Sequence, residues 1–225
     1  MRCPMREAIA RYGLRMLRVA PLLVLLGSSA AHADLPQLRS GNVFQLDVSG
    51  AAARADSAAI TSWLESNSGW GTGNLRIDFS IDVVDADAAA PTVDLVQNPV
   101  YYSPDCDASG SVPLPAGGTV EGNDGYQCLS GGDCHLLVHD AARSLLFEAF
   151  IADVTGGIFT ATCLVEWNLL AAYPPNLRGE GCTSADAAGF PIAPLLFDAD
   201  EVAAGEIAHA IRFVLPNSRI RAGQY

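Results

Sequence analysis

Two carboxylates in this sequence have surroundings that suit acid–base chemistry. Glu148 alternates with Leu146 and Phe150, so a period of two places it among apolar neighbours on one face of a strand. A carboxyl group buried on such a face has a raised pKa, which is what a general acid needs. Asp186 lies in a tight, alanine-rich turn with little side-chain bulk around it. The pair would suit glycosidic cleavage, with Glu148 as the acid and Asp186 as the base or nucleophile.

Two histidines could act as proton acceptors, which would suit lyase chemistry in the same groove. His135 begins one expected strand, and His209 lies on an apolar face of another. We expect His135, Glu148 and His209 to converge on one face, because an isolated polar residue on an apolar face is costly. Trp167 and Arg212 complete the candidate site as binding residues.

Each of these residues also has a structural alternative. Glu148 could pair with an arginine such as Arg143 or Arg212. Asp186 could be an acid that stabilises the first turn of a short helix. His209 could be a hydrogen-bonded histidine of the core.

The sequence predicts no metal site and no cofactor. His135 and His139 are four residues apart on a strand, which separates them by about 13 Å, too far to share one metal ion. Clustered carboxylates at 82–87 and 198–201 could bind calcium, but neither cluster fits the EF-hand loop. We expect solvated acidic loops at both places.

The elements that would position these residues are short and separated by turns. Helices are expected at 57–64 and 200–204, a helical turn at 183–189, and loops over the proline- and glycine-rich segment 88–132. Strands are expected at 75–83, 134–139, 145–152, 158–170 (one long or two short) and 207–213. The complete alternation over 75–83 favours an antiparallel sheet with one wet face. The predicted fold class is all-β: an antiparallel, jelly-roll-like β-sandwich with one or two short helices.

The first 33 residues have the pattern of a secretory signal peptide. Five arginines precede the apolar run Val19–Leu26, and small residues follow up to Ala33. The run is shorter than the ~20 apolar residues that cross a bilayer. We therefore expect export after cleavage near Ala33, no membrane span, and a single domain over 34–225. The formal net charge of −12 disfavours nucleic acids and acidic polysaccharides as partners and leaves neutral ligands open.

The cysteines predict disulfides. One of the six lies in the leader, and the five that remain leave one thiol over. An exported chain without a C-x-x-C pair favours disulfides over zinc. A Cys163–Cys182 bridge would close a loop of about 20 residues, worth roughly 3 kcal/mol, and would fix the turn that follows it. A second bridge is expected within Cys106, Cys128 and Cys134, with Cys128–Cys134 favoured.

Six short motifs follow one another in the second half of the chain. They are Asp133–His135, Leu146–Glu148, Val165–Leu169, Thr183–Ile192, Asp200–Val202 and His209–Arg212. The succession resembles a family of secreted bacterial and fungal proteins, mostly described as hypothetical, with the pattern D-x-H, L-Y-E, W/F-D/N-L, T-S-A-D-A-A-G-x-P-I, D-E-V and H-A-x-R. The resemblance covers about residues 133–216. The family usually continues with a proline–alanine–x–histidine element, so the resemblance implies a chain truncated at its C-terminus.

These observations predict an exported, carbohydrate-active protein whose groove gathers His135, Glu148, Asp186 and His209. If it is an enzyme, it would be a glycoside hydrolase or a polysaccharide lyase. The carbohydrate part is an analogy from the fold class. The alternative is a non-catalytic exported binding or structural module, in which the polar residues lock the core. An open cleft with Glu148 and Asp186 about 5–10 Å apart would support hydrolysis, and burial with satisfied polar atoms would support the alternative.

Overall fold

The computed structural model describes residues 35–67 and 80–215, and within them the chain forms eight strands and four short helices. The strands are β1 (Val83–Ala86), β2 (Thr92–Gln97), β3 (Ser111–Pro113), β4 (Leu136–Asp140), β5 (Leu145–Phe150), β6 (Asp153–Thr155), β7 (Ile158–Ala161) and β8 (Cys163–Asn168). The helices are the 3₁₀ turns η1 (Val43–Gln45) and η2 (Ala193–Leu195), and the α-helices α1 (Ser57–Ser66) and α2 (Ala199–Ala204). The expected signal peptide at 1–33 and most of the strand expected at 75–83 lie outside the described residues.

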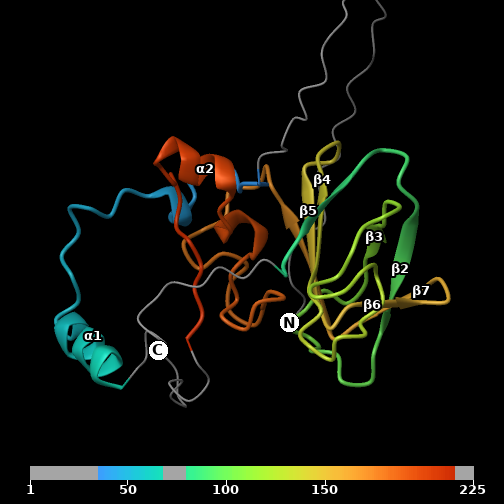
Figure 1. The fold of residues 1–225 in the computed structure, drawn as a ribbon, viewed down its shortest axis with the longest axis horizontal. Helices are drawn as coiled ribbons and strands as arrows, with labels where there is room; N and C mark the ends of the chain where they lie inside the picture. Colours follow the sequence, from blue (N-terminus) through green and yellow to red (C-terminus); the bar gives the residue numbers. More distant parts are fainter. Residues whose placement is uncertain (1–34, 68–79, 216–225) are drawn as a thin grey trace, which may run out of the picture.

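The strands form two four-stranded sheets that pack against each other (Figure 1). The strand orders are β1-β4-β5-β8, which we call the central sheet, and β3-β2-β7-β6. β1 pairs with β4, and β2 with β7, in parallel, whereas the other pairs are antiparallel. The predicted all-β sandwich with two short helices is therefore confirmed, but its sheets are mixed rather than purely antiparallel. Both parallel pairs join strands that are distant in sequence, which local alternation does not reveal.

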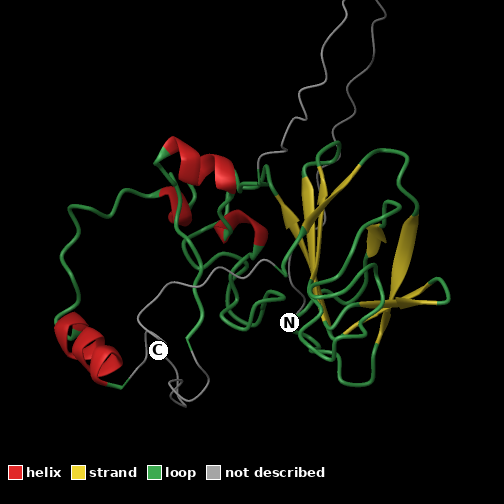
Figure 2. Ribbon diagram, in the orientation of Figure 1, coloured by secondary structure: helices red, strands yellow, loops and turns green. Residues whose placement is uncertain are grey.

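The central sheet is buried on both faces. On one face Val138 and Phe147 pack with Phe159 of the second sheet. On the other face Leu146 and Trp167 belong to a second core, which lies beneath the loops and short helices. Figure 2 shows these helices on the side of the central sheet that faces away from the second sheet. A strand covered on both sides carries a continuous apolar run, which explains why β4 begins with three apolar residues and why Glu148 is the one polar residue of β5.

A bent hairpin joins the two sheets. β5 continues into β6 through Ile151, whose φ is 48°, and β7 continues into β8 through the buried Thr162. The backbone N–H of Thr162 donates to the carbonyl of Phe150 (2.9 Å). The hydroxyl of Thr162 accepts a hydrogen bond from Asn98 Nδ2 (2.6 Å). The segment 158–170, expected as one or two strands, is thus two strands that belong to different sheets.

Side chains close the exposed edge of β8. This strand is the last of the central sheet, and three of its backbone N–H groups donate to side-chain oxygens. The bonds are Leu164 N–H to Tyr101 Oη (3.2 Å), Glu166 N–H to Asp107 Oδ2 (2.8 Å) and Asn168 N–H to Tyr173 Oη (3.0 Å). The carbonyl of Leu164 accepts the backbone N–H of Asp107 (2.9 Å). These edge groups of β8 therefore have partners, although no strand of residues 35–67 and 80–215 pairs with this edge.

Both predicted helices are confirmed. α1 covers the expected 57–64, and Figure 1 shows it at a distance from the two sheets. α2 covers the expected 200–204 and begins with a capping box between Asp198 and Glu201. It ends at Gly205, whose φ is 75°. None of the helices in the described ranges is long and apolar enough to cross a bilayer.

Three other expectations about secondary structure are wrong. The segment 207–213 is not a strand: the N–H of Ala210 donates to η1 and the N–H of Arg212 donates to η2, so no ladder forms. The segment 183–189 is a turn, closed by a bond from Gly189 N–H to the Asp186 carbonyl (2.9 Å), rather than a helix. The segment 88–132 is rich in loops, as expected, but it also contains β2 and β3, where no strand was expected.

Candidate functional site

Glu148 lies at the centre of the central sheet. It occupies the middle of β5, between Leu137 of β4 and Val165 of β8. Its side chain projects into the second core and is 0% exposed. Because both cross-strand neighbours are apolar, the carboxyl group depends on hydrogen-bond donors from elsewhere.

Four donors surround this carboxyl group. Oε1 accepts the backbone N–H groups of Ile192 (2.7 Å) and Ala193 (2.8 Å). Oε2 accepts the indole N–H of Trp167 (3.2 Å) and the hydroxyl of Ser184 (3.4 Å). Both oxygens are thus satisfied within the fold. This is the arrangement expected if Glu148 locks the core, and it leaves no oxygen directed at solvent.

Burial raises the pKa of Glu148 to about 7, while the N–H donors and the charge of His135 act in the opposite direction. The ionised carboxylate has four donors to accept. In the protonated form, Oε2–H can donate a hydrogen bond to the Ser184 hydroxyl, which accepts as well as donates. Both protonation states therefore have a hydrogen-bond arrangement, and they differ in that only the ionised state carries the cost of a buried charge.

The segment 184–193 is docked onto the central sheet by Glu148. Three of the four donors, from Ser184, Ile192 and Ala193, belong to this segment. The segment coincides with most of the T-S-A-D-A-A-G-F-P-I run. Part of the run therefore has a structural role: its conformation directs backbone N–H groups and a hydroxyl at the buried carboxyl group of Glu148.

His135 forms a close pair with Glu121. Glu121 Oε2 lies 2.6 Å from Nδ1 of His135 and accepts its backbone N–H at 3.2 Å. The backbone N–H of Glu121 donates to the carbonyl of His135 (2.8 Å). His135 is 8% exposed, and within the described ranges its Nε2 has no hydrogen-bond partner. A carboxylate on Nδ1 makes Nε2 the basic nitrogen, as in an oriented general base.

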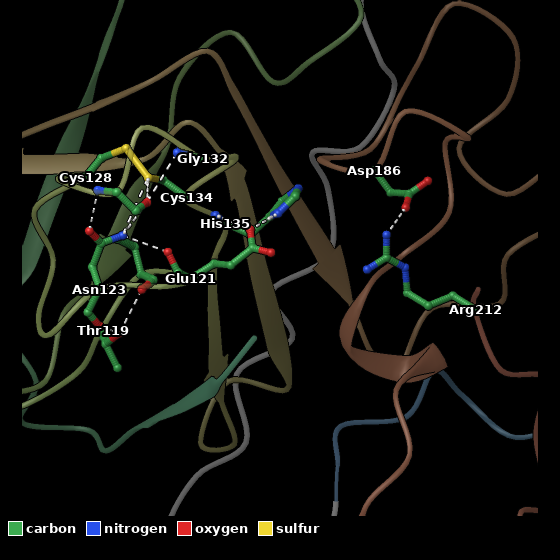
Figure 3. A network of polar contacts seen from close by, with 11 residues as sticks. Thr119, Glu121, Asn123, Cys128, Gly132, Cys134, His135, Asp186 and Arg212 are labelled. Atoms are coloured by element: carbon green, nitrogen blue, oxygen red, sulfur yellow. Dashed lines mark hydrogen bonds and ion pairs between the residues drawn. A yellow bond between two sulfur atoms is a disulfide. The ribbon is translucent and has the colours of Figure 1, made fainter. Parts of the chain in front are cut away.

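The loop that carries this pair is held by a disulfide and an asparagine (Figure 3). The Cys128–Cys134 bridge, with a sequence separation of 6, confirms the predicted pairing. Cys134 precedes His135 and has φ 46°, in the left-handed region. Asn123 accepts two backbone N–H groups of the bridged loop and donates to the carbonyl of Glu121 (2.7 Å). A strained residue fixed in this way gives His135 a single position.

Asp186 pairs with Arg212. Oδ2 of Asp186 lies 2.5 Å from Nη2 of Arg212, and both side chains are mostly buried. Oδ1 accepts the backbone N–H of Ala188 (2.7 Å). Figure 3 shows this pair apart from Glu121 and His135, with the carboxylate directed at the guanidinium. Asp186 is therefore not an isolated carboxylate beside a cleft, and Arg212, expected as a binding residue, forms an internal ion pair.

His209 lies outside the sheets. Its Nε2 is 3.1 Å from Glu201 Oε1 of α2, and its Nδ1 is 2.8 Å from the carbonyl of Ala210. The expectation that three polar residues share one sheet face is therefore wrong for His209. It holds for His135 and Glu148, which lie on the same side of the central sheet and interact electrostatically. The catalytic roles of these residues stay predictions.

Trp167 is a core residue. Its side chain is 0% exposed, and its ring packs edge-on against Tyr173 with centroids 5.3 Å apart. The guanidinium of Arg178 lies 5.7 Å from the ring centroid. A ring enclosed in this way offers no surface to a ligand, so the expected binding role does not fit its position.

The predicted Cys163–Cys182 bridge is wrong. Cys163 is bonded to Cys106, with Cα atoms 5.4 Å apart. The segment around Cys106 runs along the edge of β8, as the bonds of Asp107 show, and this brings the two sulfur atoms together. Proximity along the chain had favoured the other pairing. The expected leftover thiol is not found, because no cysteine in the described part of the chain is free.

In both acidic clusters, at 82–87 and 198–201, carboxylates bind other groups of the protein and do not converge on one point where a metal ion could bind. Asp85 pairs with His139 across β1 and β4 (2.9 Å). Asp198 and Glu201 form the capping box of α2, and Glu201 also contacts His209. In residues 35–67 and 80–215, no group of three or more side chains is placed to hold a metal ion.

A hollow of about 300 Å³ opens at one end of the sandwich. Its walls come from residues 87–92, from Pro113 and from the β4–β5 turn at 140–143, so both sheets contribute. The buried carboxylate of Asp140 orients Arg143. It accepts hydrogen bonds from the backbone N–H (2.9 Å) and from the Nε–H (2.6 Å) of Arg143. Among the described residues, the two terminal nitrogens of Arg143 have no hydrogen-bond partner. None of the four predicted catalytic residues lines this hollow.

Sequence reasoning missed Glu121 and Arg143 as members of polar arrangements. Glu121 lies in a proline- and glycine-rich loop, without a period or motif to mark it. Arg143 was considered only as a partner of Glu148, whereas it pairs with Asp140 in its own turn. An aspartate three residues before an arginine in a short hairpin turn was the available signal.

Comparison with protein-family models, with curated proteins and with solved structures gave no match to this chain. The resemblance to a family of secreted proteins therefore stays a prediction from the motifs.

Proposed function

We propose that this chain is an exported, non-catalytic carbohydrate-binding module. The observation that carries this choice is the state of Glu148, which is fully buried and whose two oxygens accept four hydrogen bonds. A general acid must reach the leaving oxygen of its substrate. Glu148 has no oxygen left for that contact, and Asp186, the other expected carboxylate, is paired with Arg212.

The hollow beside Arg143 is the proposed ligand site. Terminal guanidinium nitrogens donate, the Asp87 carboxylate accepts, and the Thr92 hydroxyl does both, which matches the hydroxyl groups of a sugar. Besides Asp140, which holds Arg143, the rest of the wall consists of alanines and Pro113, which can contact the C–H face of a sugar ring. A volume of about 300 Å³ is at the lower end for ligand pockets and suits one or two rings. The net charge of −12 favours neutral saccharides over acidic ones.

Export and binding can be tested together. The secreted chain would be probed with immobilised and soluble neutral glucan, mannan and xylan oligosaccharides, and the products of prolonged incubation would be analysed. We expect saturable binding without cleavage, and at least about tenfold weaker binding for Arg143→Ala, because a charged hydrogen-bond donor is lost. Arg54→Ala removes the same charge from an exposed ion pair and is the matched control. Unchanged binding by Arg143→Ala would refute the site, and failure of every probe to bind would refute the function.

The second candidate is an enzyme in which His135 is the base. The Glu121–His135 pair favours it, because a carboxylate on Nδ1 and an unpartnered Nε2 form the base and the orienting group of a proton-transfer site. In this case the same polysaccharides would be cleaved. Glu121→Gln and His135→Ala would abolish cleavage while leaving secretion intact, whereas Arg143→Ala would leave it unchanged. Absence of cleavage products with the wild type rules this candidate out for these substrates.

A further inference from the structure

We propose that Glu148 is a protonation-controlled latch: its side chain fastens the segment 184–193 onto the central sheet, and loss of its proton loosens that attachment. The proposal concerns a conformational equilibrium of the chain and does not depend on which ligand it binds.

The latch is defined by where its parts come from. Glu148 belongs to β5, and the Trp167 donor belongs to β8, so both stay with the sheet. The Ser184 hydroxyl and the N–H groups of Ile192 and Ala193 come from the segment that covers them. Lifting the segment away would break three bonds at once and expose the carboxyl group to water. Docking and burial of Glu148 are therefore the same event.

Few charges can compete for this site. His135, directly before β4, is the charged group among the described residues whose interaction bears on Glu148, and it favours the ionised form. Its partner Glu121 lies 2.6 Å from Nδ1 and carries the opposite charge. On the covering segment, Asp186 is paired with Arg212. Arg178, which lies over the ring of Trp167, is paired with Asp107. Desolvation thus dominates the behaviour of the carboxyl group.

The direction of the effect follows from proton linkage. In the docked state burial raises the pKa of Glu148 to about 7, whereas a solvated glutamate keeps its ordinary value near 4.5. Between these two values the docked state holds a proton that the open state releases. Docking is therefore strongest below about pH 4.5, weakens as the pH rises, and becomes independent of pH above about 7. Between pH 5 and pH 8 the opening equilibrium should rise on the order of 50-fold.

The indole N–H of Trp167 reports on the latch directly, because it donates to Oε2 of Glu148. Its ¹⁵N–¹H resonance would be followed from pH 4 to pH 9, with Trp63→Phe and Trp70→Phe used for assignment. We expect a titration with a midpoint near 7. A resonance that does not move between pH 5.5 and pH 8.5 would overturn the proposal, and this measurement needs no substitution of Glu148.

Hydrogen exchange measures the opening itself. Exchange of the Ile192 and Ala193 amides would be compared at pH 5 and pH 8 after correction for intrinsic rates. In the wild type we expect the protection of these amides to fall by more than about tenfold. Glu148→Gln keeps an oxygen for the two amides and cannot ionise, so its protection should change by less than about twofold. Glu65→Gln, on α1, is the matched control and should behave like the wild type.

The outcomes separate clearly. Equal pH dependence in the wild type and in Glu148→Gln would show that another group drives the opening. Protection that is constant in the wild type would show that the segment does not respond to pH. If Glu148→Gln fails to fold, the indole titration and the wild-type exchange still decide the question.

Discussion

The two disulfides of the described chain should contribute unequally to stability, and the difference can be worked out from the loops they close. Cys106–Cys163 spans a sequence separation of 57, whereas Cys128–Cys134 spans 6. A cross-link lowers the entropy of the unfolded chain by an amount that grows with the logarithm of the loop length. Replacing each pair by alanines removes that restriction from one loop at a time.

The expected magnitudes follow from the chain-entropy relation. For a loop of 57 residues it gives about 4 kcal/mol at 25 °C, and for a loop of 6 residues about 2 kcal/mol. Cys106, Cys134 and Cys163 are each at most 2% exposed and Cys128 is partly buried, so the loss of buried sulfur is no smaller for the Cys106–Cys163 pair and does not oppose the entropic difference. The double variant Cys106→Ala/Cys163→Ala should therefore be about 2 kcal/mol less stable than Cys128→Ala/Cys134→Ala.

Equilibrium unfolding in urea, followed by far-UV circular dichroism, is the appropriate assay. Besides a lower midpoint, the variant without Cys106–Cys163 should show a larger m-value, because its unfolded chain expands more. If Cys128→Ala/Cys134→Ala lost as much stability as the other double variant, the loop-length argument would be refuted. The short bridge would then act mainly by holding Cys134 at its positive φ beside His135.

Three further substitutions test the packing. Glu148→Ala should cost about 3–5 kcal/mol in urea unfolding, because it leaves four buried donors without an acceptor. Asp186→Ala should cost about 1–2 kcal/mol in the same assay, because Arg212 loses its partner in a mostly buried pair. Gly118→Ala should cost about 1–3 kcal/mol in thermal unfolding, because the added Cβ would overlap the Tyr126 hydroxyl.

Each of these expectations has a control that shares its chemistry. Glu206→Ala removes an exposed carboxylate and should change stability by less than about 0.5 kcal/mol. Asp47→Ala does the same for an exposed aspartate. Gly50→Ala adds a Cβ that meets nothing within 4 Å. If a test variant and its control lose the same amount of folding stability, the loss comes from the change of residue type and not from the described contact.

Local signals in the sequence were sufficient for the elements that form by local interactions. The hairpin was expected as 134–139 and 145–152, and it is β4 and β5 joined by the turn at 141–144. The terminal glycine, Gly205, marked the end of α2. Hydrophobic alternation and short polar turns determine such elements, so they can be identified without knowing the rest of the fold.

Long-range pairings were not accessible in the same way. β2 has an alternating pattern, but prolines at 91 and 99 suggested a loop. The segment becomes a strand because it pairs with β3 on one side and with β7 on the other. In contrast, 207–213 alternates equally well but pairs with no strand of the described ranges. A pattern of period two becomes a strand only where the fold supplies a partner.

The candidate site was predicted in part for a similar reason. The burial of Glu148 follows from its apolar strand neighbours and was expected. Two of its donors are backbone amides of Ile192 and Ala193, which have no side-chain signature. Glu121 reaches His135 only because the bridged loop folds back on itself. Contacts made by backbone groups or by irregular loops leave no period in a sequence.

The closed edge of β8 limits how copies of this chain can associate. An edge strand normally invites a strand from another molecule to extend the sheet. Here an incoming strand would have to displace Tyr101, Asp107 and Tyr173 from the amides they occupy. Asp107 is also held by Arg178, and Tyr173 packs on Trp167, so displacement would disturb the second core. Sheet-to-sheet polymerisation through β8 therefore requires partial unfolding, and conditions that keep the second core intact also protect the chain from aggregation at this edge.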